Sequence, residues 1–374
     1  MKIRKAIISV LLVLCICVVP TACSAKKTEV KSLAVLHEPE FGGVYIKITI
    51  DEFNSRGFEY GDSVDVAFSN GYVLKDIPYY NGYYVDSGEP LLIAYPGYDY
   101  IKAAVNYGDD LWVTSGIKDT DTATVTLAEH GKYKNVQEAR DISYSDERSK
   151  YTTDEEFANF RCVTVGNIKD DVFYRSASPC DNQHNRAPYV DDLIEKANVS
   201  RILDLADSES KIEGYISAEG FDSPYFLSLY KNGKVIPLAM SMNYNADDFK
   251  AKIAAGFTAL AQDSGSFLVH CTEGKDRTGF MCMLLEALAG ASYQEIVDDY
   301  MITYDNYYKI TEKSDKTKYD TILEKNLVAM IKVVVGDSSV DITKADLSVY
   351  AKNFLIGTGM KEADISELVK LLTE

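Results

Sequence analysis

The sequence predicts a small all-β domain followed by an α/β domain whose central sheet is flanked by helices. The chain has 374 residues, which is enough for two domains of about 100–200 residues each. Between residues 35 and 135, short stretches of alternating apolar and polar residues are separated by turn signals. After residue 157, short apolar runs alternate with segments of helical periodicity, and this alternation indicates an α/β domain.

The composition excludes several classes of protein. Hydrophobic residues make up 46% and charged residues 26% of the chain, as in a globular protein with a sizeable core. The net charge of −18 argues against a protein that binds nucleic acid through phosphate contacts, so we expect no nucleic-acid partner. The four histidines are scattered, and the sequence therefore predicts no metal site and no cofactor.

Residues 1–22 are predicted to be a signal peptide. Three cations precede an apolar run over residues 6–19, and small residues then lead to Cys23. This ending resembles the lipobox of bacterial lipoproteins, which implies that Cys23 is lipidated and anchors the mature chain to the cell membrane. An ordinary secreted protein and an uncleaved N-terminal anchor are the alternatives, and all three place the remaining chain outside the cytoplasm. Residues 23–34 are then predicted to be the lipoprotein tether.

Residues 35–135 are predicted to form a β-barrel or sandwich. Residues 44–50 alternate between apolar and polar, and two turn signals, Ser69-Asn70-Gly71 and Asn81-Gly82, separate further apolar runs. Tyrosine, a good strand former, is unusually abundant in the chain at 27 residues. Residues 136–156 are polar and charged, and are predicted to be a linker or an extended arm that lies on the next domain.

Residues 157–374 are predicted to be the α/β domain. The predicted strands are residues 172–175, 201–205 and 266–270, and the predicted helices are 189–198, 246–262, 278–288, 293–307 and 364–372. Asn245 is the predicted N-cap of the helix over 246–262. A disulfide between Cys162 and Cys180 is left open, since only their proximity in the sequence supports it.

The loop between the strand 266–270 and the helix 278–288 carries the predicted chemistry. Backbone N–H groups and the positive end of the helix dipole favour an anion at the helix start. Cys271 begins the loop, and this position favours the thiolate form of its sulfur. Arg277, six residues later, has a planar guanidinium group that can bind two oxygens of one phosphate. These features predict in-line attack on a phosphate monoester and a phosphocysteine intermediate.

The segment from His270 to Gly279 resembles the signature of the protein-tyrosine-phosphatase superfamily. Its sequence, HCTEGKDRTG, is most similar to the HCxxGKDRTG loop of the bacterial tyrosine/lipid phosphatases. Residues 157–161, 174–179 and 298–301 look like further landmarks of that group. The resemblance covers about residues 155–374 and implies the cysteine-phosphatase fold. It also implies hydrolysis of phosphotyrosine, with phosphoserine, phosphoinositides or inositol phosphates as further substrates.

The residues of the loop are assigned to different roles. Cys271 is the predicted nucleophile, Arg277 binds the phosphate, and the Thr278 hydroxyl donates to the sulfur when the thiolate leaves. His270 and Gly279 are predicted to hold the loop in shape, His270 without acting as a base. The backbone N–H groups that form the predicted phosphate cradle belong to Thr272, Glu273, Gly274, Lys275, Asp276 and Arg277.

The sequence offers alternative candidates for the general acid. Asp276 is favoured, because related bacterial enzymes with Lys-Asp in this loop are thought to use that aspartate. Asp247 and Asp248 lie where many members of the superfamily carry a movable acid, but no Trp-Pro-Asp triplet is present, so these residues are expected to begin a helix. Lys275 either reaches a second phosphate of the substrate or faces solvent.

Two other classes of protein compete with an exported phosphatase. The first is a catalytically inactive phosphate-binding or adhesion module on the cell surface. Intact Cys271 and Arg277 argue against it, since lost catalysis is usually visible at those positions. The second is a redox thiol protein, but Cys271 has no CxxC partner in the sequence.

Overall fold

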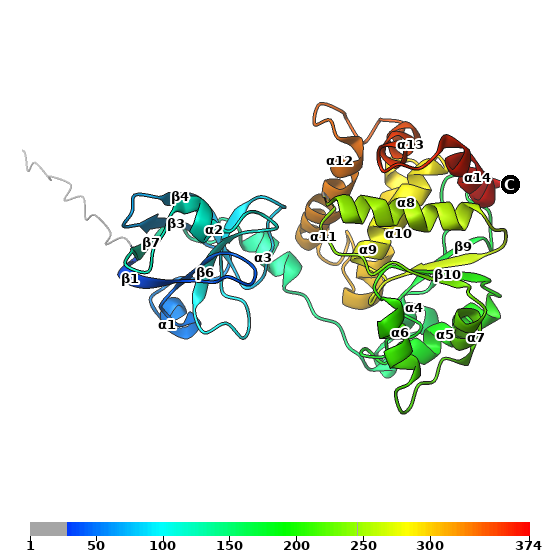
Figure 1. Ribbon diagram of the computed structural model, residues 1–374, viewed down its shortest axis with the longest axis horizontal. Helices are drawn as coiled ribbons and strands as arrows, with labels where there is room; N and C mark the ends of the chain where they lie inside the picture. The colour runs from blue at the N-terminus through cyan, green and yellow to red at the C-terminus, as the bar shows by residue number, and fades with distance from the viewer. Residues whose placement is uncertain (1–27, 245) are drawn as a thin grey trace, which may run out of the picture.

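A computed structural model describes residues 28–244 and 246–374 and folds them into two domains (Figure 1). The N-terminal domain is a closed β-barrel, and the C-terminal domain is a five-stranded sheet with helices on both faces. This is the predicted fold class. The predicted signal peptide and Cys23 lie outside the described residues. No helix among residues 28–244 and 246–374 is both long and apolar enough to cross a membrane.

The barrel closes through seven strands in the order β1-β2-β6-β5-β4-β3-β7. All of its strand pairs are antiparallel except β4 with β5. Alternate side chains point inwards, as Val64, Val66 and Phe68 of β3 illustrate with exposures of 0–4%. The strands are β1 (Glu29–His37), β2 (Val44–Ile46), β3 (Ser63–Phe68), β4 (Val73–Tyr80), β5 (Pro90–Ile93), β6 (Ile101–Val105) and β7 (Thr122–Glu129). Two short helices, α1 (Ile50–Ser55) and α2 (Leu111–Ser115), lie in the connections.

Two predicted boundaries differ from the structure. Residues 29–34, predicted as tether, form the start of β1, because Val30 is buried and pairs with Val125 of β7. Helix α3 (Lys134–Arg140) crosses the predicted start of the linker. The following stretch includes a 3₁₀ turn, η1 (Arg148–Lys150), and leads to α4 (Asp154–Ala158).

Residues 141–153 lie along the C-terminal domain as an arm rather than as a free linker. Arg186 holds this arm, because its guanidinium group donates to the Ser145 carbonyl at 3.0 Å, to Asp146 Oδ1 at 2.8 Å and to Tyr151 Oη at 3.2 Å. The Arg186 side chain is 2% exposed. Since a buried guanidinium needs partners for its N–H groups, these bonds fix the path of the arm.

The sheet of the C-terminal domain has the order β11-β10-β12-β9-β8. Three of its four strand pairings are parallel, and the edge strand β8 (Arg161–Cys162) pairs antiparallel with β9. The other strands are β9 (Phe173–Ser176), β10 (Arg201–Asp204), β11 (Val235–Pro237) and β12 (Phe267–His270). All residues of β12 are buried, as expected for a strand covered on both faces by helices.

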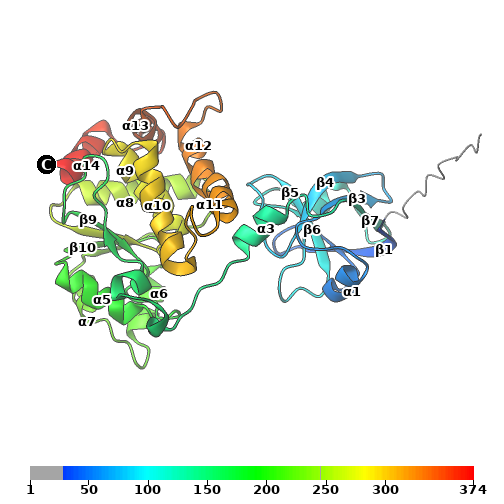
Figure 2. The ribbon, with the colours of Figure 1, turned by 180° about the vertical axis from the view of Figure 1, so that it is seen from behind.

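Helices cover both faces of this sheet (Figures 1 and 2). The first group packs on the face that carries Tyr174, Ile202 and Leu268, and the second packs on the face that carries Phe173, Leu203 and Val269. The first group is α4, α5 (Ala187–Lys196), α6 (Glu209–Ile216) and α7 (Pro224–Lys231). The second is α8 (Asp247–Ala261), α9 (Asp276–Leu288), α10 (Tyr293–Tyr308), α11 (Lys316–Ile322), the π-helical segment η2 (Leu323–Val328), α12 (Ala329–Val335), α13 (Leu347–Gly357) and α14 (Glu362–Thr373).

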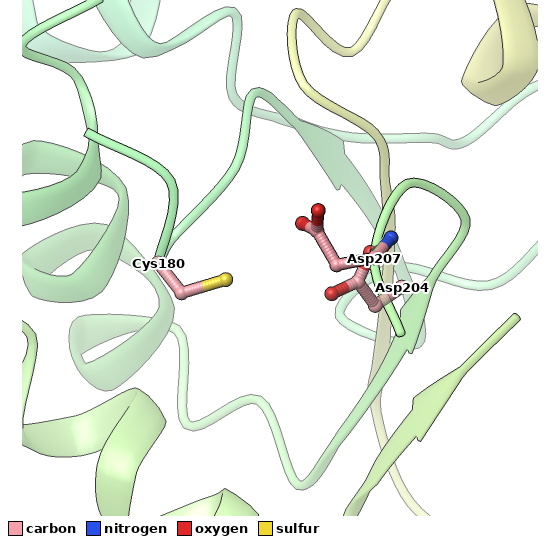
Figure 3. A group of neighbouring side chains, drawn as sticks. All are labelled: Cys180, Asp204 and Asp207. Carbon is pink, nitrogen blue, oxygen red and sulfur yellow. Dashed lines mark hydrogen bonds between the residues drawn. The ribbon is translucent and has the colours of Figure 1, made fainter. Parts of the chain in front are cut away.

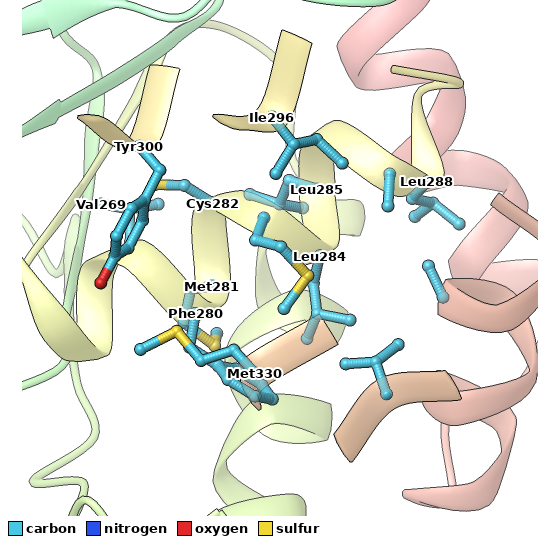
Figure 4. Close-up of a cluster of buried hydrophobic side chains, with 14 of the residues drawn as sticks. Val269, Phe280, Met281, Cys282, Leu284, Leu285, Leu288, Ile296, Tyr300 and Met330 are labelled. Atoms are coloured by element: carbon cyan, nitrogen blue, oxygen red, sulfur yellow. The ribbon is translucent and has the colours of Figure 1, made fainter. Parts of the chain in front are cut away.

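Helix α9 is the central helix of the second group. Every residue from Thr278 to Leu288 is buried, which fits a helix that is apolar on nearly all sides. Figure 4 shows its side chains packed between Val269 of the sheet, Tyr300 of α10 and Met330 of α12. The strand β12 and the helix α9 therefore form a rigid support for the loop that joins them.

Candidate active site

The loop between β12 and α9 begins with Cys271. The preceding strand ends at His270, and the helix starts at Asp276, two residues earlier than predicted. Cys271 is a free thiol, is 3% exposed, and lies where the backbone turns from a strand towards a helix N-terminus. This is the position that an anion-binding loop requires.

Four consecutive backbone N–H groups of this loop have no hydrogen-bond acceptor among the described residues. They belong to Thr272, Glu273, Gly274 and Lys275. Buried or half-buried backbone N–H groups are nearly always paired in folded proteins, so a run of free donors indicates a binding site for an acceptor. At the start of a helix, the preferred acceptor is an oxyanion.

The carbonyl groups of the same loop are held from behind. Tyr307 Oη donates to the Glu273 carbonyl at 2.8 Å, and Asn159 Nδ2 and Arg175 Nη2 each donate to the Gly274 carbonyl at 3.2 Å. The C=O and N–H groups of a trans peptide unit point in opposite directions. The next N–H groups along the chain therefore point away from these three side chains, and the free donors are held in place.

The two loop glycines are required by close approaches. Gly274 has a φ of +69°, and a Cβ atom there would lie 2.2 Å from the Ser176 carbonyl oxygen at the end of β9. A Cβ atom on Gly279 would lie 2.6 Å from Cε2 of Tyr300. Any side chain at either position would push the loop or its helix away from the supporting elements.

A buried ion cluster supports the loop through Arg175. Asp299 accepts hydrogen bonds from Arg161 Nε at 2.8 Å and from Arg175 Nη1 at 2.6 Å. Burial raises the pKa of Asp299, but the two guanidinium groups outweigh it and hold this pKa well below the usual range. These three residues belong to the segments that look like family landmarks in the sequence, and the structure connects them to the Gly274 carbonyl.

Replacing Asp299 by alanine should lower the free energy of unfolding by about 3–5 kcal/mol, because it leaves two buried guanidinium groups without a counter-charge. Urea unfolding of both proteins measures the difference. The lowered pKa makes this contribution greatest above the unfolded-state value of about 3.9, so the difference should shrink as the pH falls below that value. The matched control is Asp298→Ala on the exposed face of the same helix, and equal stability of the two variants would contradict the role of Asp299.

Arg277 returns towards the start of the loop from the first turn of α9. Its Nη2 donates to Thr272 Oγ1 at 3.4 Å and its Nη1 to the Met240 carbonyl at 3.2 Å. The guanidinium group thus lies beside the free N–H groups. Thr278, the next residue, is buried, and its Oγ1 has no hydrogen-bond partner among the described residues.

His270 is fully buried and directly precedes Cys271. Burial lowers its pKa to about 4, so the ring is neutral near pH 7. Its Nδ1 lies 3.3 Å from the Cys271 carbonyl oxygen, and a neutral ring that donates this hydrogen bond fixes the backbone at Cys271. These contacts support the structural role predicted for this histidine.

Lys275 is paired within the loop. Its Nζ donates to Tyr308 Oη at 3.1 Å and lies 3.0 Å from Glu273 Oε2. The lysine side chain is 17% exposed, so it does not project freely into solvent. Burial lowers the pKa of Lys275, but the charges around it, first that of Asp276, raise it well above the usual value, and Lys275 stays charged.

The candidate acids lie in different surroundings. Asp276 is the first residue of α9, with a 37% exposed side chain, and it lines a cavity of about 1070 Å³ together with Met242 and Tyr244. Asp247 and Asp248 are exposed in the first turn of α8, as their helix-start interpretation requires. The predicted cap Asn245 lies outside the described residues, and Ala246 occupies the N-cap position without a side-chain bond.

A second buried group lies close to His270 and contains Cys180, Asp204 and Asp207 (Figure 3). One ligand atom from each lies within 4.8 Å of the others, and this donor set could hold a divalent cation such as Zn²⁺. Burial raises the pKa of Asp204 to about 6 and the pKa of the Cys180 thiol well above its usual value. Cys162 and Cys180 are free thiols, so the disulfide left open by the sequence is absent.

Tyr144 is a site residue that the sequence interpretation missed. Its hydroxyl donates to Glu273 Oε1 at 2.8 Å, and its ring stacks on Tyr307 at a centroid distance of 4.8 Å. The residue lies in the polar segment predicted as a linker. A tyrosine within such a segment is the only local signal in the sequence. The hydrogen bond to Glu273 shows that the arm reaches the loop that begins at Cys271.

The chain belongs to the tyrosine phosphatase family, whose family model matches residues 155–374. A protein of Cupriavidus necator, named as a candidate tyrosine-protein phosphatase, is 47% identical over 47 residues, which are 13% of this chain and 17% of the relative. A tyrosine-protein phosphatase of Nostoc commune is 54% identical over 43 residues, or 12% and 15% of the two chains. The matches thus span less than a fifth of these curated relatives.

A solved structure of TpbA from P. aeruginosa, in complex with pTyr, is 13% identical to this chain. The similarity covers 52% of this chain and 91% of that one, with a TM-score of 0.27. The family membership agrees with the resemblance that the loop His270–Gly279 carries in the sequence.

Proposed function

We propose that the protein is a phosphatase that hydrolyses phosphate monoesters, above all phosphotyrosine, through a phosphocysteine intermediate. The observation that carries the proposal is the run of four free N–H groups, Thr272 to Lys275, between Cys271 and Arg277. A nucleophilic sulfur, an oxyanion cradle and a guanidinium group in one short loop are what phosphoryl transfer to a thiolate needs.

In the first step the Cys271 thiolate attacks phosphorus in line with the scissile bond. The S–P bond forms as the P–O bond breaks, and Asp276 donates its proton to the leaving oxygen. Arg277 and the free N–H groups bind the three non-bridging oxygens, whose charge they stabilise in the transition state. The alcohol or phenol then departs.

In the second step a water molecule attacks the phosphocysteine. Asp276, now a carboxylate, takes one proton from this water, the S–P bond breaks, and inorganic phosphate forms. The unpaired hydroxyl of Thr278 donates to the departing sulfur, which leaves as a thiolate. The steps use no metal ion and no cofactor, so the cluster at Cys180 is not assigned a part in them.

Phosphotyrosine is proposed as the main substrate for two reasons. The matched family is described by tyrosine phosphatase activity, and two relatives carry that name. Lys275 is already paired with Glu273 and Tyr308, which favours a monophosphate over an inositol polyphosphate. Phosphoserine and phosphoinositide monophosphates are further substrates within this proposal.

Replacing Arg277 by lysine tests the cradle. We expect kcat for para-nitrophenyl phosphate to fall by about 10²–10³, because a point charge cannot bind two phosphate oxygens in the transition state as a planar fork does. Steady-state kinetics of the purified proteins measures the loss. A variant with the full rate would contradict this role of Arg277, whereas a wild-type protein without any turnover would favour the inactive phosphate-binding module.

We further propose that the enzyme acts outside the cytoplasm and is attached to the membrane through a lipid at Cys23. The support is the charged start, the apolar run and the small residues before this cysteine. Cell fractionation of the wild-type chain and a Cys23→Ser variant tests the anchor. The proposal fails if both proteins distribute identically between membrane and soluble fractions.

A further inference from the structure

The cavity beside Asp276 lies between the two domains. It has a volume of about 1070 Å³, at the upper end of what small-molecule sites occupy. One wall comes from the barrel, and the other comes from the end of α3 and from the phosphatase domain. The barrel contributes Phe41, Tyr83, Val85, Asp86, Ser87, Tyr95, Tyr98, Val105, Asn106, Tyr107 and Gly108. The opposite wall consists of Arg140, Met242, Tyr244, Asp276, Glu324, Lys325, Asn326, Ala329, Met330, Lys332 and Val333.

Two contacts attach the barrel to the phosphatase domain, one through α3 and one through the arm that follows it. Helices α3 and α11 lie side by side in both views of the molecule (Figures 1 and 2), and Arg140 Nη2 donates to the Lys325 carbonyl at 3.2 Å. On the other side, the arm residue Tyr144 bonds to Glu273 of the catalytic loop. The barrel is thus attached to the domain that contains Cys271 and Asp276.

The cavity adjoins the phosphate cradle on the side of the general acid. Asp276 lines the cavity, whereas Cys271 and Arg277 do not. The segment 240–244 connects the cavity with the phosphate cradle. Arg277 bonds to the carbonyl of Met240, while Tyr244, which lines the cavity, stacks on Phe280 at 4.7 Å. An acid must touch the leaving oxygen, so a leaving group in contact with Asp276 continues into this cavity.

Exposed aromatic side chains lie on the barrel wall of the cavity. Within residues 28–244 and 246–374, the exposed Phe, Tyr and Trp side chains are those of Phe41, Tyr95 and Tyr107, with exposures of 71%, 46% and 56%. All three line this one cavity. Clustering of exposed aromatic surface at a single place marks a binding surface rather than chance exposure.

A buried cation lies behind part of the same wall. The Lys102 side chain is fully buried and forms an ion pair with Glu38 at 2.8 Å. Its Nζ lies 5.1–6.0 Å from the centroids of four aromatic rings, those of Phe41, Tyr45, Tyr83 and Tyr98. The contacts with the buried ammonium group orient Tyr83 and Tyr98 of the wall, and the exposed Tyr95 packs against both rings.

We propose that this cavity binds the peptide that carries the phosphotyrosine, and that Phe41, Tyr95 and Tyr107 of the barrel determine substrate specificity. The inference rests on the proposed phosphatase function. The cavity is larger than one phenyl ring requires, so residues that flank the phosphotyrosine occupy the rest. Its charged lining has both signs: Arg140, Lys325 and Lys332 are basic, and Asp86, Asp276 and Glu324 are acidic. This mixture fits a peptide with mixed side chains better than a polyanionic lipid headgroup.

The test compares two substrates and two variants of the full chain. The substrates are phenyl phosphate and a phosphotyrosyl peptide with several residues on each side. For Tyr95→Ala/Tyr107→Ala we expect kcat/KM for the peptide to fall at least about 10-fold, mainly through KM, as loss of aromatic contact residues does at interfaces. The loss for phenyl phosphate should be much smaller. The control Val113→Ala, 68% exposed on the barrel but outside the cavity, should change neither value.

The outcomes separate this inference from the function on which it rests. A peptide-selective loss supports the inference. Equal, small effects on both substrates in an enzyme that hydrolyses phenyl phosphate would overturn the inference alone. A selective loss with vesicles of phosphatidylcholine and a phosphoinositide monophosphate, but not with the peptide, would replace the peptide by a lipid. Absence of any turnover in the wild type would overturn the proposed function, and with it this inference.

Discussion

Replacing Cys271 by serine should abolish turnover of para-nitrophenyl phosphate, with a loss of about 10⁵-fold or more. His270 would be a poor base for a serine hydroxyl in this loop, because burial lowers its pKa to about 4 and its Nδ1 bonds to the Cys271 carbonyl. The free N–H groups and Arg277 remain in the variant, so binding of inorganic phosphate should persist. Initial rates and titration calorimetry with phosphate measure the two properties.

The matched control is Cys162→Ser, which removes a thiol on the edge strand β8. It should retain the wild-type rate, because β8 is the edge strand and β9 separates it from β12, the strand that leads to the loop. The wild-type rate should also be unchanged by a chelator. Full activity of Cys271→Ser, or a requirement for added metal, would contradict the thiolate mechanism and direct attention to the cluster of Cys180, Asp204 and Asp207.

Replacing Asp276 by asparagine should lower the rate by roughly 10²–10⁴ for phenyl esters with poor leaving groups, because the leaving oxygen then departs without a proton. The loss should shrink as the leaving group becomes more acidic and needs less protonation. A series of substituted phenyl phosphates, with kcat/KM plotted against the pKa of the leaving phenol, measures this dependence. The variant should show a steeper slope than the wild type.

Asp247→Asn and Asp248→Asn are the controls for this prediction. Both residues are exposed at the start of α8, and neither lines the cavity that Asp276 faces. Their effects on the rate should be mild. The opposite pattern, with Asp276→Asn near the wild-type rate and either control severely impaired, would show that the segment before α8 supplies the proton.

Much of the C-terminal domain could be predicted because local sequence and tertiary packing agree there. The strand β12 is a continuous apolar run, and its residues are buried on both faces as the pattern indicates. Cys271 and Arg277 could be identified from the sequence because the chemistry needs a sulfur and a guanidinium group close together in one loop. The predicted start of α9 is two residues late. Asp276 and Arg277 are charged, so the sequence pattern does not include them in a buried helix.

The features that could not be predicted depend on contacts between segments distant in sequence. Tyr144 lies 129 positions before the Glu273 carboxylate that it binds, and no local pattern reports such a contact. The buried pair of Lys102 and Glu38 looks in sequence like two ordinary surface charges. The predicted start of the barrel domain differs from the structure for a similar reason. Val30 pairs with β7, so part of the predicted polar tether forms a strand.

Trapping the covalent intermediate tests the central claim most directly. The Asp276→Asn variant is mixed with para-nitrophenyl phosphate, whose acidic leaving group needs little protonation, and is denatured within the first turnover without acid. Loss of the base then slows hydrolysis of the intermediate more than its formation. Mass spectrometry of the digested protein should find one phosphoryl group on the peptide that contains Cys271, and none in a Cys271→Ser/Asp276→Asn protein. Product release by the wild type with no phosphorylated cysteine trapped in the Asp276→Asn variant, or a phosphoryl group on another residue, would contradict the phosphocysteine mechanism.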